Sequence, residues 1–428
     1  MSEKDLSSLK VNQDRLMGDI HHTCQWDTGE RWGTASTETG MSRLSLSDAD
    51  KEARDWFVET AKAQGCKTTV DTMGNIFAVR PGLCNDAPPT FAGSHLDTQP
   101  TGGRYDGILG VTAAVEMLKV LNENWVETEY PVGVVNWTNE EGARFPISMV
   151  SSGVWAGSIP LEHAHNLREV GGGTATMKSE LERIGYLGSV PASHTSIPMA
   201  AHFELHIEQG PILEAENRKI GIVKGVQAYR WFTVTVRGGD CHTGTTDFKN
   251  RADALLAASK MILQSHRAAT RMKALASTGI LTLRPGSTNT VPGTVRFSLD
   301  IRAAKDETVE GLEKQLKRDF AAIAAGEDVG NLNEGAIGFH EDCISCVTES
   351  ARGIFGDKAE DLTKSMISGA GHDSVYTSKR VPTSMIFVPS KDGVSHNPVE
   401  YTSPEDCALG AQVLLGAVLR YDRMRAGR

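Results

Sequence analysis

Apolar and polar positions alternate with two different periods along the N-terminal part of the chain. The helical period over 48–64 predicts an amphipathic helix that ends at Gly65, since glycine commonly follows a helix. A strand over 75–79 and a largely apolar helix over 108–121 follow, and the apolar run 132–137 predicts a buried strand. This alternation is typical of a mostly parallel α/β sheet that binds ligands at its strand ends.

The pattern changes near Gly225. In 229–237, the apolar residues Phe232, Val234 and Val236 alternate with polar ones, as in a strand with one buried face. The elements expected next are a helix over 251–269, strands over 279–283 and 294–301, and a helix over 307–325. This succession is self-contained and predicts an α+β domain.

A chain of 428 residues exceeds a typical single core, so two domains are expected. We predict that the α+β domain is an insertion over 225–342. The segments 1–224 and 343–428 then form one domain, because the short strands at 366–368 and 384–388 return to the first sheet.

Composition and charge narrow the class of protein. The net charge is −10 with acids and bases interspersed, and no basic patch with interleaved aromatics occurs, so no nucleic-acid partner is expected. No apolar run approaches the ~18 residues that span a membrane, and the polar segment 1–10 lacks the core of a signal peptide. Seven scattered cysteines indicate reduced thiols in a cytoplasmic protein.

An imidazole and several carboxylates follow the predicted strands. His95 and Asp97 come shortly after the apolar run 90–92, and Glu140 and Glu141 follow the strand that ends at Trp137. Adjacent residues at such a point face different directions. One glutamate can therefore bind a metal while the other faces the substrate as a proton acceptor.

The spacing of His95 and Asp97 leaves two interpretations open. Residues two positions apart lie on the same side of an extended segment. Both side chains could bind metal, or Asp97 could accept the second ring N–H of His95 and fix its tautomer.

Asp106 is the candidate for a carboxylate shared between two ions, because the glycines that flank it allow a tight loop. His206, in a strand-like run, and His396, in the loop after the last apolar strand, supply two further nitrogens. With His95 and Glu141, these residues can hold two tetrahedral ions that share Asp106 and a water. Such mixed ligation suits zinc first, with manganese, cobalt or nickel as alternatives.

On these motifs, the chain resembles the amidase/hydantoinase/carbamoylase branch of the two-metal exopeptidase superfamily, which includes β-ureidopropionase and N-carbamoyl-L-amino-acid hydrolase. The resemblance runs from about Gly33 to the C-terminus. Six motifs occur in the family's order: Gly93-Ser94-His95-Leu96-Asp97-Thr98, Gly102-Gly103-Arg104-Tyr105-Asp106-Gly107, Thr138-Asn139-Glu140-Glu141-Gly142-Ala143-Arg144-Phe145, Leu205-His206-Ile207-Glu208-Gln209-Gly210-Pro211, Gly369-Ala370-Gly371-His372-Asp373-Ser374 and Ser395-His396-Asn397-Pro398. The histidine at 206 separates this branch from most aminopeptidases of the superfamily, which carry a carboxylate there.

The resemblance implies an α/β catalytic domain with a mixed central sheet and an inserted α+β lid and dimerisation domain. It also implies that His95, Asp106, Glu141, His206 and His396 bind two divalent ions per subunit, with Asp106 bridging them.

Roles for other residues follow from the same resemblance. Glu140 matches the family's general base. Asp97 matches the residue that orients a metal-binding side chain, and Gln209 matches a polar residue of the substrate pocket. His372 and Asp373 either line the cleft or support it from behind.

Three residues of the inserted domain match substrate-binding positions of the family. His242 matches a histidine that reaches over the scissile group, and Asn289 and Arg302 match the residues that hold the substrate carboxylate. Cys241 stands where many relatives have alanine, and 145–149 departs from the phenylalanine-rich version of some carbamoylases, so side-chain preference can differ.

The implied activity is metal-dependent hydrolysis of the ureido group of N-carbamoyl amino acids to amino acid, ammonia and carbon dioxide. The implied partners are a small-molecule substrate and a second copy of the chain, bound through the lid domain. Alternatives are an allantoate amidohydrolase, an acylamino-acid amidase and, more distantly, a non-catalytic binding protein. Glu140 argues against the last, since a binding protein has no need of a carboxylate that binds no metal.

Overall fold

A computed structural model describes residues 6, 8–323, 327–334 and 337–427. The chain forms two compact units: a larger unit, residues Met1–Gly225 and Phe339–Arg428, and an inserted unit, Val226–Gly338. The chain returns to the larger unit at Phe339 rather than at position 343. The Phe339 N–H donates to the carbonyl of Lys224 over 2.9 Å, and helix α11 (Glu341–Phe355) begins two residues later.

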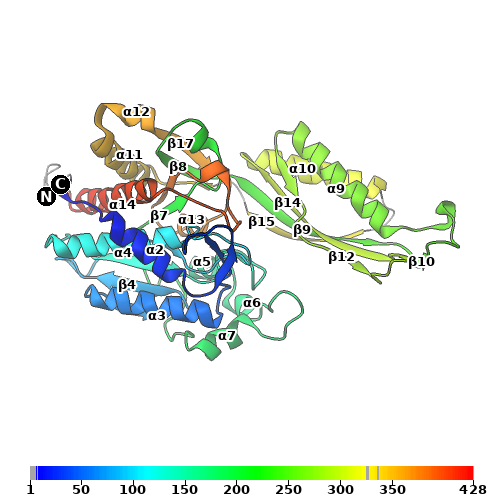
Figure 1. The fold of residues 1–428 in the computed structure, drawn as a ribbon, viewed down its shortest axis with the longest axis horizontal. Helices are drawn as coiled ribbons and strands as arrows, with labels where there is room; N and C mark the ends of the chain where they lie inside the picture. The colour runs from blue at the N-terminus through cyan, green and yellow to red at the C-terminus, as the bar shows by residue number, and fades with distance from the viewer. Residues whose placement is uncertain (1–5, 7, 324–326, 335–336, 428) are drawn as a thin grey trace. The chain divides into compact units, whose positions relative to one another are not determined.

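A mixed β-sheet forms the centre of the larger unit (Figure 1). Its strands are β3 (Lys67–Val70), β4 (Ile76–Arg80), β5 (Thr90–His95), β6 (Val132–Trp137), β7 (Ala201–Ile207), β8 (Ile220–Val226), β17 (Thr363–Ser368) and β18 (Thr383–Val388). They lie in the order β8-β18-β7-β5-β6-β4-β3, and β17 pairs with β8. The four central strands, β18, β7, β5 and β6, are mutually parallel.

The mixed central sheet implied by the resemblance is confirmed, whereas the mostly parallel sheet predicted from alternation is wrong at the edges. Strand β4 runs antiparallel to β6, and β8 runs antiparallel to β18. The link between β4 and β5, residues 81–89, contains no helix and is too short for a crossover, so these two strands run in opposite directions with β6 between them.

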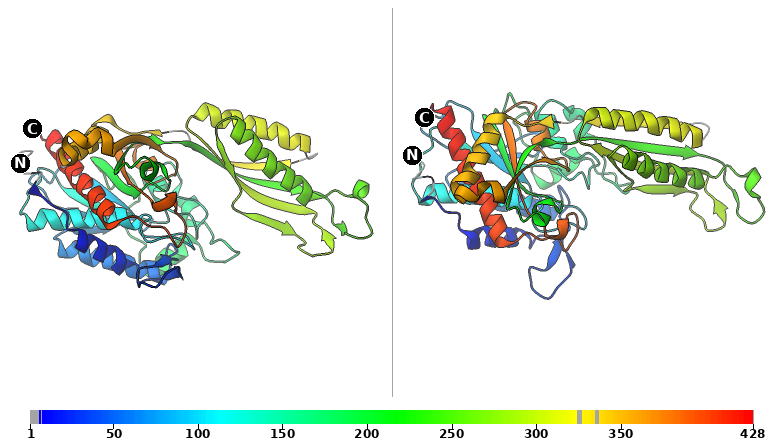
Figure 2. Two further views of the ribbon diagram at one scale, coloured as in Figure 1. Left: turned by 45° about the horizontal axis from the view of Figure 1, so that its top comes forward. Right: turned by 90° about the horizontal axis from the view of Figure 1, so that it is seen from above.

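Helices cover both faces of this sheet (Figures 1 and 2). Helices α4 (Ile108–Glu123) and α14 (Pro404–Arg425) contact β5 and β7, and α2 (Gln13–Thr23) packs on both of these helices. The other helices of this unit are α3 (Asp48–Ala63), α5 (Val150–Trp155), α6 (Leu161–His165), α7 (Met177–Ile184), α8 (Ile212–Ala215), α12 (Ala359–Leu362) and α13 (Ser374–Thr377).

Local sequence signals explain several element boundaries. Helix α3 begins after Ser47, whose side chain accepts the N–H of Asp50, and it ends before Gly65, which has a φ of +78°. Helix α14 begins with Ser403 as its N-cap and Pro404 in its first turn. The predicted helices at 48 and 108 and the predicted strand 132–137 are confirmed.

A chain of aromatic side chains holds the end of β6 in place. The ring centroids of Phe77 and Phe91 are 5.7 Å apart, those of Phe77 and Trp137 are 5.6 Å apart, and those of Trp137 and Trp155 are 5.7 Å apart, all with edge-to-face geometry. Because Trp137 is the last residue of β6 and is fully buried, the segment that follows it leaves the sheet from a fixed point.

The inserted unit contains an antiparallel sheet with two helices on one face (Figure 1). Its elements are β9 (Ala228–Arg237), α9 (Ala254–Arg271), β11 (Leu275–Ser277), β12 (Leu281–Arg284), β14 (Thr294–Ala303), α10 (Asp306–Ile323) and β15 (Glu327–Glu334). Alternate residues of β9 and β14 form its core with α9 and α10. Strand β15 was not predicted, and residues 324–325 of the predicted last helix lie outside the described residues.

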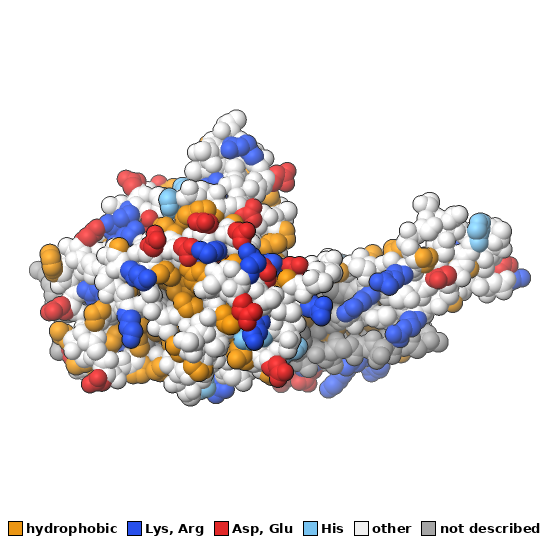
Figure 3. All heavy atoms as spheres, turned by 90° about the horizontal axis from the view of Figure 1, so that it is seen from below, with side chains coloured by type: hydrophobic (Ala, Val, Ile, Leu, Met, Phe, Trp, Pro, Cys, Tyr) orange, Lys and Arg blue, Asp and Glu red, His pale blue; other side chains and the backbone are white. Residues whose placement is uncertain are grey.

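The charge of the surface and the apolar character of the helices are relevant to possible partners. Figure 3 shows acidic and basic side chains interspersed over one face of the larger unit, as they are along the sequence. Among the described residues, no helix combines the length and apolar character that crossing a membrane requires.

Candidate metal centre

The ends of the four parallel strands bring the predicted ligands together. His95 is the last residue of β5, and His206 is the sixth residue of β7. Glu141 follows β6, and His396 lies in the segment after β18. Asp106 enters from the loop before α4. Since neighbouring parallel strands end at the same edge, residues far apart in the sequence meet here.

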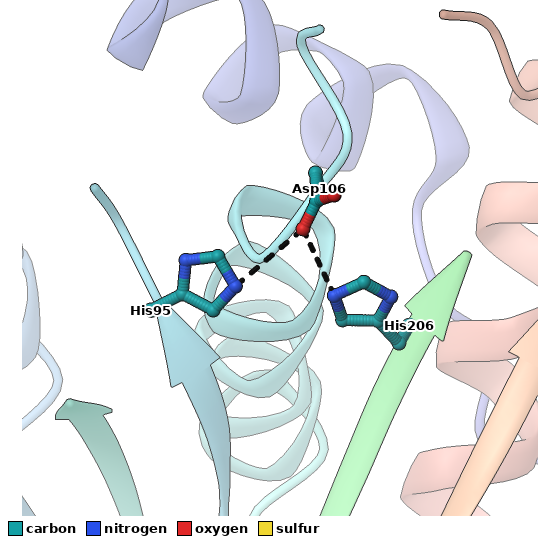
Figure 4. A group of neighbouring side chains, drawn as sticks. All are labelled: His95, Asp106 and His206. Carbon is teal, nitrogen blue, oxygen red and sulfur yellow. Dashed lines mark ion pairs between the residues drawn. The ribbon is translucent and has the colours of Figure 1, made fainter. Parts of the chain in front are cut away.

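The first ligand group consists of His95, Asp106 and His206 (Figure 4). The Nε2 atoms of His95 and His206 lie 3.5 and 3.1 Å from the same oxygen, Oδ1 of Asp106. The three side chains are buried. Two ligands at about 2.0–2.2 Å from one tetrahedral ion lie roughly 3.4 Å apart, which matches this spacing.

The hydrogen bonds of both rings select the neutral tautomer in which Nε2 carries no proton and is available to a cation. Nδ1 of His95 lies 2.9 Å from the carbonyl of Asp97, and Nδ1 of His206 lies 2.9 Å from the carbonyl of Ile207. A carbonyl can only accept, so Nδ1 carries the ring proton in each case. Neither Nε2 has a hydrogen-bond partner. Two nitrogen lone pairs thus face the oxygen of Asp106, an arrangement that a bound cation stabilises.

The second ligand group consists of Asp106, Glu141 and His396. Nε2 of His396 lies 3.5 Å from Oδ2 of Asp106 and 3.4 Å from Oε2 of Glu141. Each oxygen of Asp106 therefore faces a different group, as expected of a carboxylate that bridges two ions. The side chain of His396 is 50% exposed, so this group opens to solvent.

The charges of the site also favour cations. Burial, with the charge of Asp106 adding to it, raises the pKa of Glu141 to about 7. Burial raises the pKa of Glu140 well above its usual range, and His95 opposes that shift. Carboxylates held close together and out of water repel one another, and bound divalent ions remove this repulsion.

Glu140 belongs to neither ligand group, although it is buried beside them. Its Oε2 lies 3.5 Å from Nε2 of His95. Two adjacent glutamates thus differ in position: Glu141 faces His396, and Glu140 faces the first group. A raised pKa makes the Glu140 carboxylate a stronger proton acceptor.

Asp97 orients His95 through its main-chain carbonyl rather than through its carboxylate. Neither interpretation of the spacing between the two residues is therefore correct. The carbonyl of Asp97 accepts the ring proton of His95, while its carboxylate oxygen is 4.0 Å from the same nitrogen. The carboxylate instead accepts the backbone N–H groups of Glu140 and Glu141, each over 3.3 Å. Asp97 therefore orients His95 and also fixes the turn that carries both glutamates.

Gly107 is required next to the first ligand group. Its φ is +67°, and an added Cβ would lie only 2.3–2.5 Å from three ring atoms of His95. Only glycine combines this backbone conformation with such a close approach. His396 has a φ of +53°, a conformation that costs free energy in a residue with a side chain.

Three polar residues contact the ligands from the side. Gln209 donates from Nε2 to Oδ2 of Asp106 over 2.7 Å, so this predicted pocket residue also touches the bridging carboxylate. Gln99 donates to Oε2 of Glu141 over 2.8 Å. Glu400 accepts the backbone N–H of Asp106 over 3.1 Å. The sequence reasoning missed Gln99 and Glu400. Their only signal was proximity in sequence to Asp97 and His396.

His372 and Asp373 are buried beside the site. Both are buried, with 1% and 0% of their surface exposed. The His372 ring centroid lies 4.4 Å from that of His206, and the hydroxyl of Ser152 donates to the Asp373 carboxylate.

His242 and Asn289 lie side by side at one end of the inserted unit. His242 is in the short ribbon of β10 (Cys241–His242) and β13 (Thr290–Val291), where it pairs with Thr290. The N–H of Thr243 donates to the carbonyl of Asn289 over 3.0 Å. The side chain of His242 is exposed.

Arg302 lies toward the far end of strand β14 from this ribbon. The ribbon adjoins the start of β14, because the N–H of Gly238 donates to the carbonyl of Gly293 over 2.7 Å. Arg302 is eight residues beyond Thr294 along β14, or roughly 26 Å at 3.3 Å per residue. At this separation, a substrate of the size of an amino-acid derivative cannot contact His242 and Arg302 of one chain together.

Comparisons with known proteins bear on the whole chain. The model of Peptidase family M20/M25/M40 matches residues 91–420. An N-carbamoyl-L-amino-acid amidohydrolase of Rhizobium meliloti is 38% identical over 415 residues, which cover 96% of each chain. An allantoate amidohydrolase of Bacillus subtilis is 32% identical over 89% of this chain and 92% of its own. The crystal structure of an amidase of the hydantoinase/carbamoylase family from Burkholderia vietnamiensis superposes with a TM-score of 0.89 at 42% identity, over 96% of this chain and 98% of that one.

Proposed function

The chain belongs to Peptidase family M20/M25/M40, and on that basis we propose that it hydrolyses the ureido group of N-carbamoyl amino acids. The reaction adds water across the bond between the carbamoyl carbon and the amino nitrogen, which releases the amino acid and carbamic acid, and the carbamic acid breaks down to ammonia and carbon dioxide. The geometry that supports hydrolysis most strongly is the Asp106 carboxylate, whose two oxygens face two different ligand groups. The substrate class is supported by relatives named as N-carbamoyl-L-amino-acid amidohydrolases.

Two divalent ions per subunit fit the residues present. His95, Asp106 and His206 would hold one ion, and Asp106, Glu141 and His396 the other. The imidazole and carboxylate donors favour zinc, with manganese, cobalt and nickel as alternatives. Bound ions of this kind supply Lewis acidity and an acidified water.

The residues of the chain supply the remaining steps. Glu140 accepts the proton of the attacking water and later delivers it to the leaving amino nitrogen. Asp97 keeps Glu140 in place through the backbone N–H bond. Asn289 and Arg302 anchor the substrate carboxylate, and His242 stabilises the developing oxyanion.

A homodimer reconciles these roles with the distance between His242 and Arg302. If one copy contributes Arg302 and its partner contributes His242 and Asn289, the three residues can contact one small substrate without spanning the length of β14. The separation along β14 supports this arrangement. The seven cysteines are free thiols, which supports a reducing, cytoplasmic location.

The decisive experiment combines one substitution with a panel of substrates. Glu140→Gln should keep both ions, counted by inductively coupled plasma mass spectrometry, and lose about 10²- to 10⁴-fold in kcat, because only the proton acceptor is removed. Near-normal turnover in this variant would exclude the role of Glu140.

The substrate panel separates the candidate activities. We expect ammonia release from N-carbamoyl-L-α-amino acids or N-carbamoyl-β-alanine. Release from allantoate alone would support the second candidate, which the Bacillus subtilis relative favours. Amino-acid release from an N-acetyl amino acid without ammonia formation would instead identify an acylamino-acid amidase.

A further inference from the structure

Glu400 is a buried carboxylate that connects the two loops of the metal centre. It lies between β18 and α14, and only 2% of its surface is exposed. Its Oε1 accepts the backbone N–H groups of Tyr105 and Asp106, each over 3.1 Å. Its Oε2 accepts the hydroxyl of Ser395 over 3.0 Å. One side chain thus bonds both to the loop that carries Asp106 and to the residue before His396.

The loop before Asp106 is shaped to receive this carboxylate. A Cβ at Gly103 would lie 2.2 Å from Oε1 and 2.4 Å from Cδ of Glu400. A residue with a side chain at position 103 would therefore displace the carboxylate. Glycine there lets Glu400 reach the N–H groups, which fixes the peptide plane from which the Asp106 side chain projects.

Ser395 makes a second connection that bears on the bridging carboxylate itself. Its hydroxyl oxygen lies 3.1 Å from Oδ2 of Asp106 as well as 3.0 Å from Oε2 of Glu400. Gln209 donates to that hydroxyl over 3.2 Å. A hydroxyl carries a single proton, so Ser395 can donate fully to only one of the two carboxylates.

We propose that Glu400 is a positioning residue, which fixes the backbone at Asp106 and draws the Ser395 proton away from Oδ2 of Asp106. That oxygen faces the second ligand group, with Glu141 and His396. Oδ2 already accepts an N–H of Gln209 over 2.7 Å, so a hydrogen bond from Ser395 would compete with a cation for the lone pair that remains. Glu400 thereby favours the second ion in particular. This inference rests on the proposed two-metal function.

The first ligand group depends less on Glu400. His95 and His206 face the other oxygen of Asp106, Oδ1. Their rings are held by the carbonyls of Asp97 and Ile207. A residue that served only to stabilise the fold would affect both groups alike. A selective effect on the second ion therefore distinguishes the proposed role from a purely structural one.

The test uses Glu400→Gln and a matched control. The amide oxygen of the new side chain can still accept the two N–H groups, whereas its NH₂ group would face Ser395 and direct that hydroxyl proton to Asp106. Glu116→Gln is the control, because Glu116 is fully buried and accepts the N–H of Asn12 over 2.8 Å, in contact with α2 rather than with a ligand.

Bound ions would first be counted in the full-length proteins as isolated. The proteins would then be dialysed against a chelator and titrated with Co²⁺, whose visible absorption reports binding at each site. We expect wild type and Glu116→Gln to bind two ions. Glu400→Gln should bind the first ion normally and the second at least about tenfold more weakly. Adding Ser395→Ala to Glu400→Gln should restore much of the second affinity, because the competing proton is then gone.

Three results would overturn the proposal: equal weakening of both ions, the same loss in Glu116→Gln, or no rescue by Ser395→Ala. If Glu400→Gln does not fold, Glu400→Asp keeps the charge but withdraws it by one carbon–carbon bond from Ser395 and from the two N–H groups, and the second ion should then be weakened more than the first. Wild-type protein that binds no Co²⁺ would refute the two-metal function itself, which is a different outcome from each of these.

Discussion

Replacing Gly107 by alanine tests whether the packing around His95 controls the metal centre. The new Cβ would lie 2.3 Å from Cε1 of His95, whereas ordinary contacts begin at 3.4 Å, so the ring must recede by about 1 Å. Ligand positions tolerate deviations of only about 0.2 Å. The backbone conformation at position 107, with φ +67° and ψ −46°, is sparsely populated by residues with a side chain and adds a cost of about 1–3 kcal/mol.

We therefore expect Gly107→Ala to lose the ion of the first ligand group and about 10²-fold in turnover, since a 1 Å misplacement is worth roughly that factor. The assays are ion counting, ammonia release from an N-carbamoyl amino acid and urea unfolding. Gly65→Ala is the matched control. Gly65 also has a positive φ, +78°, but no atom lies within 4 Å of the added Cβ. It should lose about 1–2 kcal/mol of stability and keep both ions.

The comparison separates backbone strain from displacement of a ligand. Both variants carry the strain, but only Gly107→Ala moves the ring of His95. A Gly107→Ala protein that holds two ions and turns over at the wild-type rate would refute the reasoning, as would an equal loss of ions in Gly65→Ala.

Two further predictions concern pH and assembly. Burial lowers the pKa of His202 from 6.5 to about 4, so its neutral form contributes stability that is present above pH 6.5 and lost as the pH falls toward 4. The loss is worth up to about 3 kcal/mol, and urea unfolding at several pH values should show a shallower acid slope in His202→Gln; an unchanged slope would contradict the assignment. For assembly, His242→Ala and Arg302→Ala should each be inactive, yet their co-refolded mixture should regain roughly a quarter of wild-type activity, because random pairing gives half heterodimers with one intact site each. A mixture no more active than its components would argue against sites shared between two copies.

Much of the fold was predictable because periodicity is a local property. The strand 132–137 and the start of the helix at 108 match the structure, since continuous apolar runs identify buried elements. Strand β15 escaped prediction, because its residues, rich in asparagine, glycine and acid, carry no alternating pattern. The antiparallel edges of the central sheet depend on strand order, which the local pattern does not encode.

The candidate site, like the fold, was predictable only in part. Side-chain chemistry alone identified residues that now lie within 3.1–3.5 Å of one another, such as His206, Asp106 and His396. It did not reveal that the carbonyl of Asp97, rather than its carboxylate, accepts the proton of His95. Both groups belong to the same residue, so only the geometry could distinguish them.

The sequence by itself determined the kinds of donor, their attachment to strand ends and the family to which the chain belongs. These depend on residue type and on spacing over a few positions. The tertiary structure decided which oxygen of Asp106 faces which ligands and that Glu400 bonds to a loop 294 residues away in sequence. It also decided that the ribbon of His242 adjoins one end of β14 while Arg302 lies toward the other. Such distances follow from strand order and packing across the whole chain, which no local pattern contains.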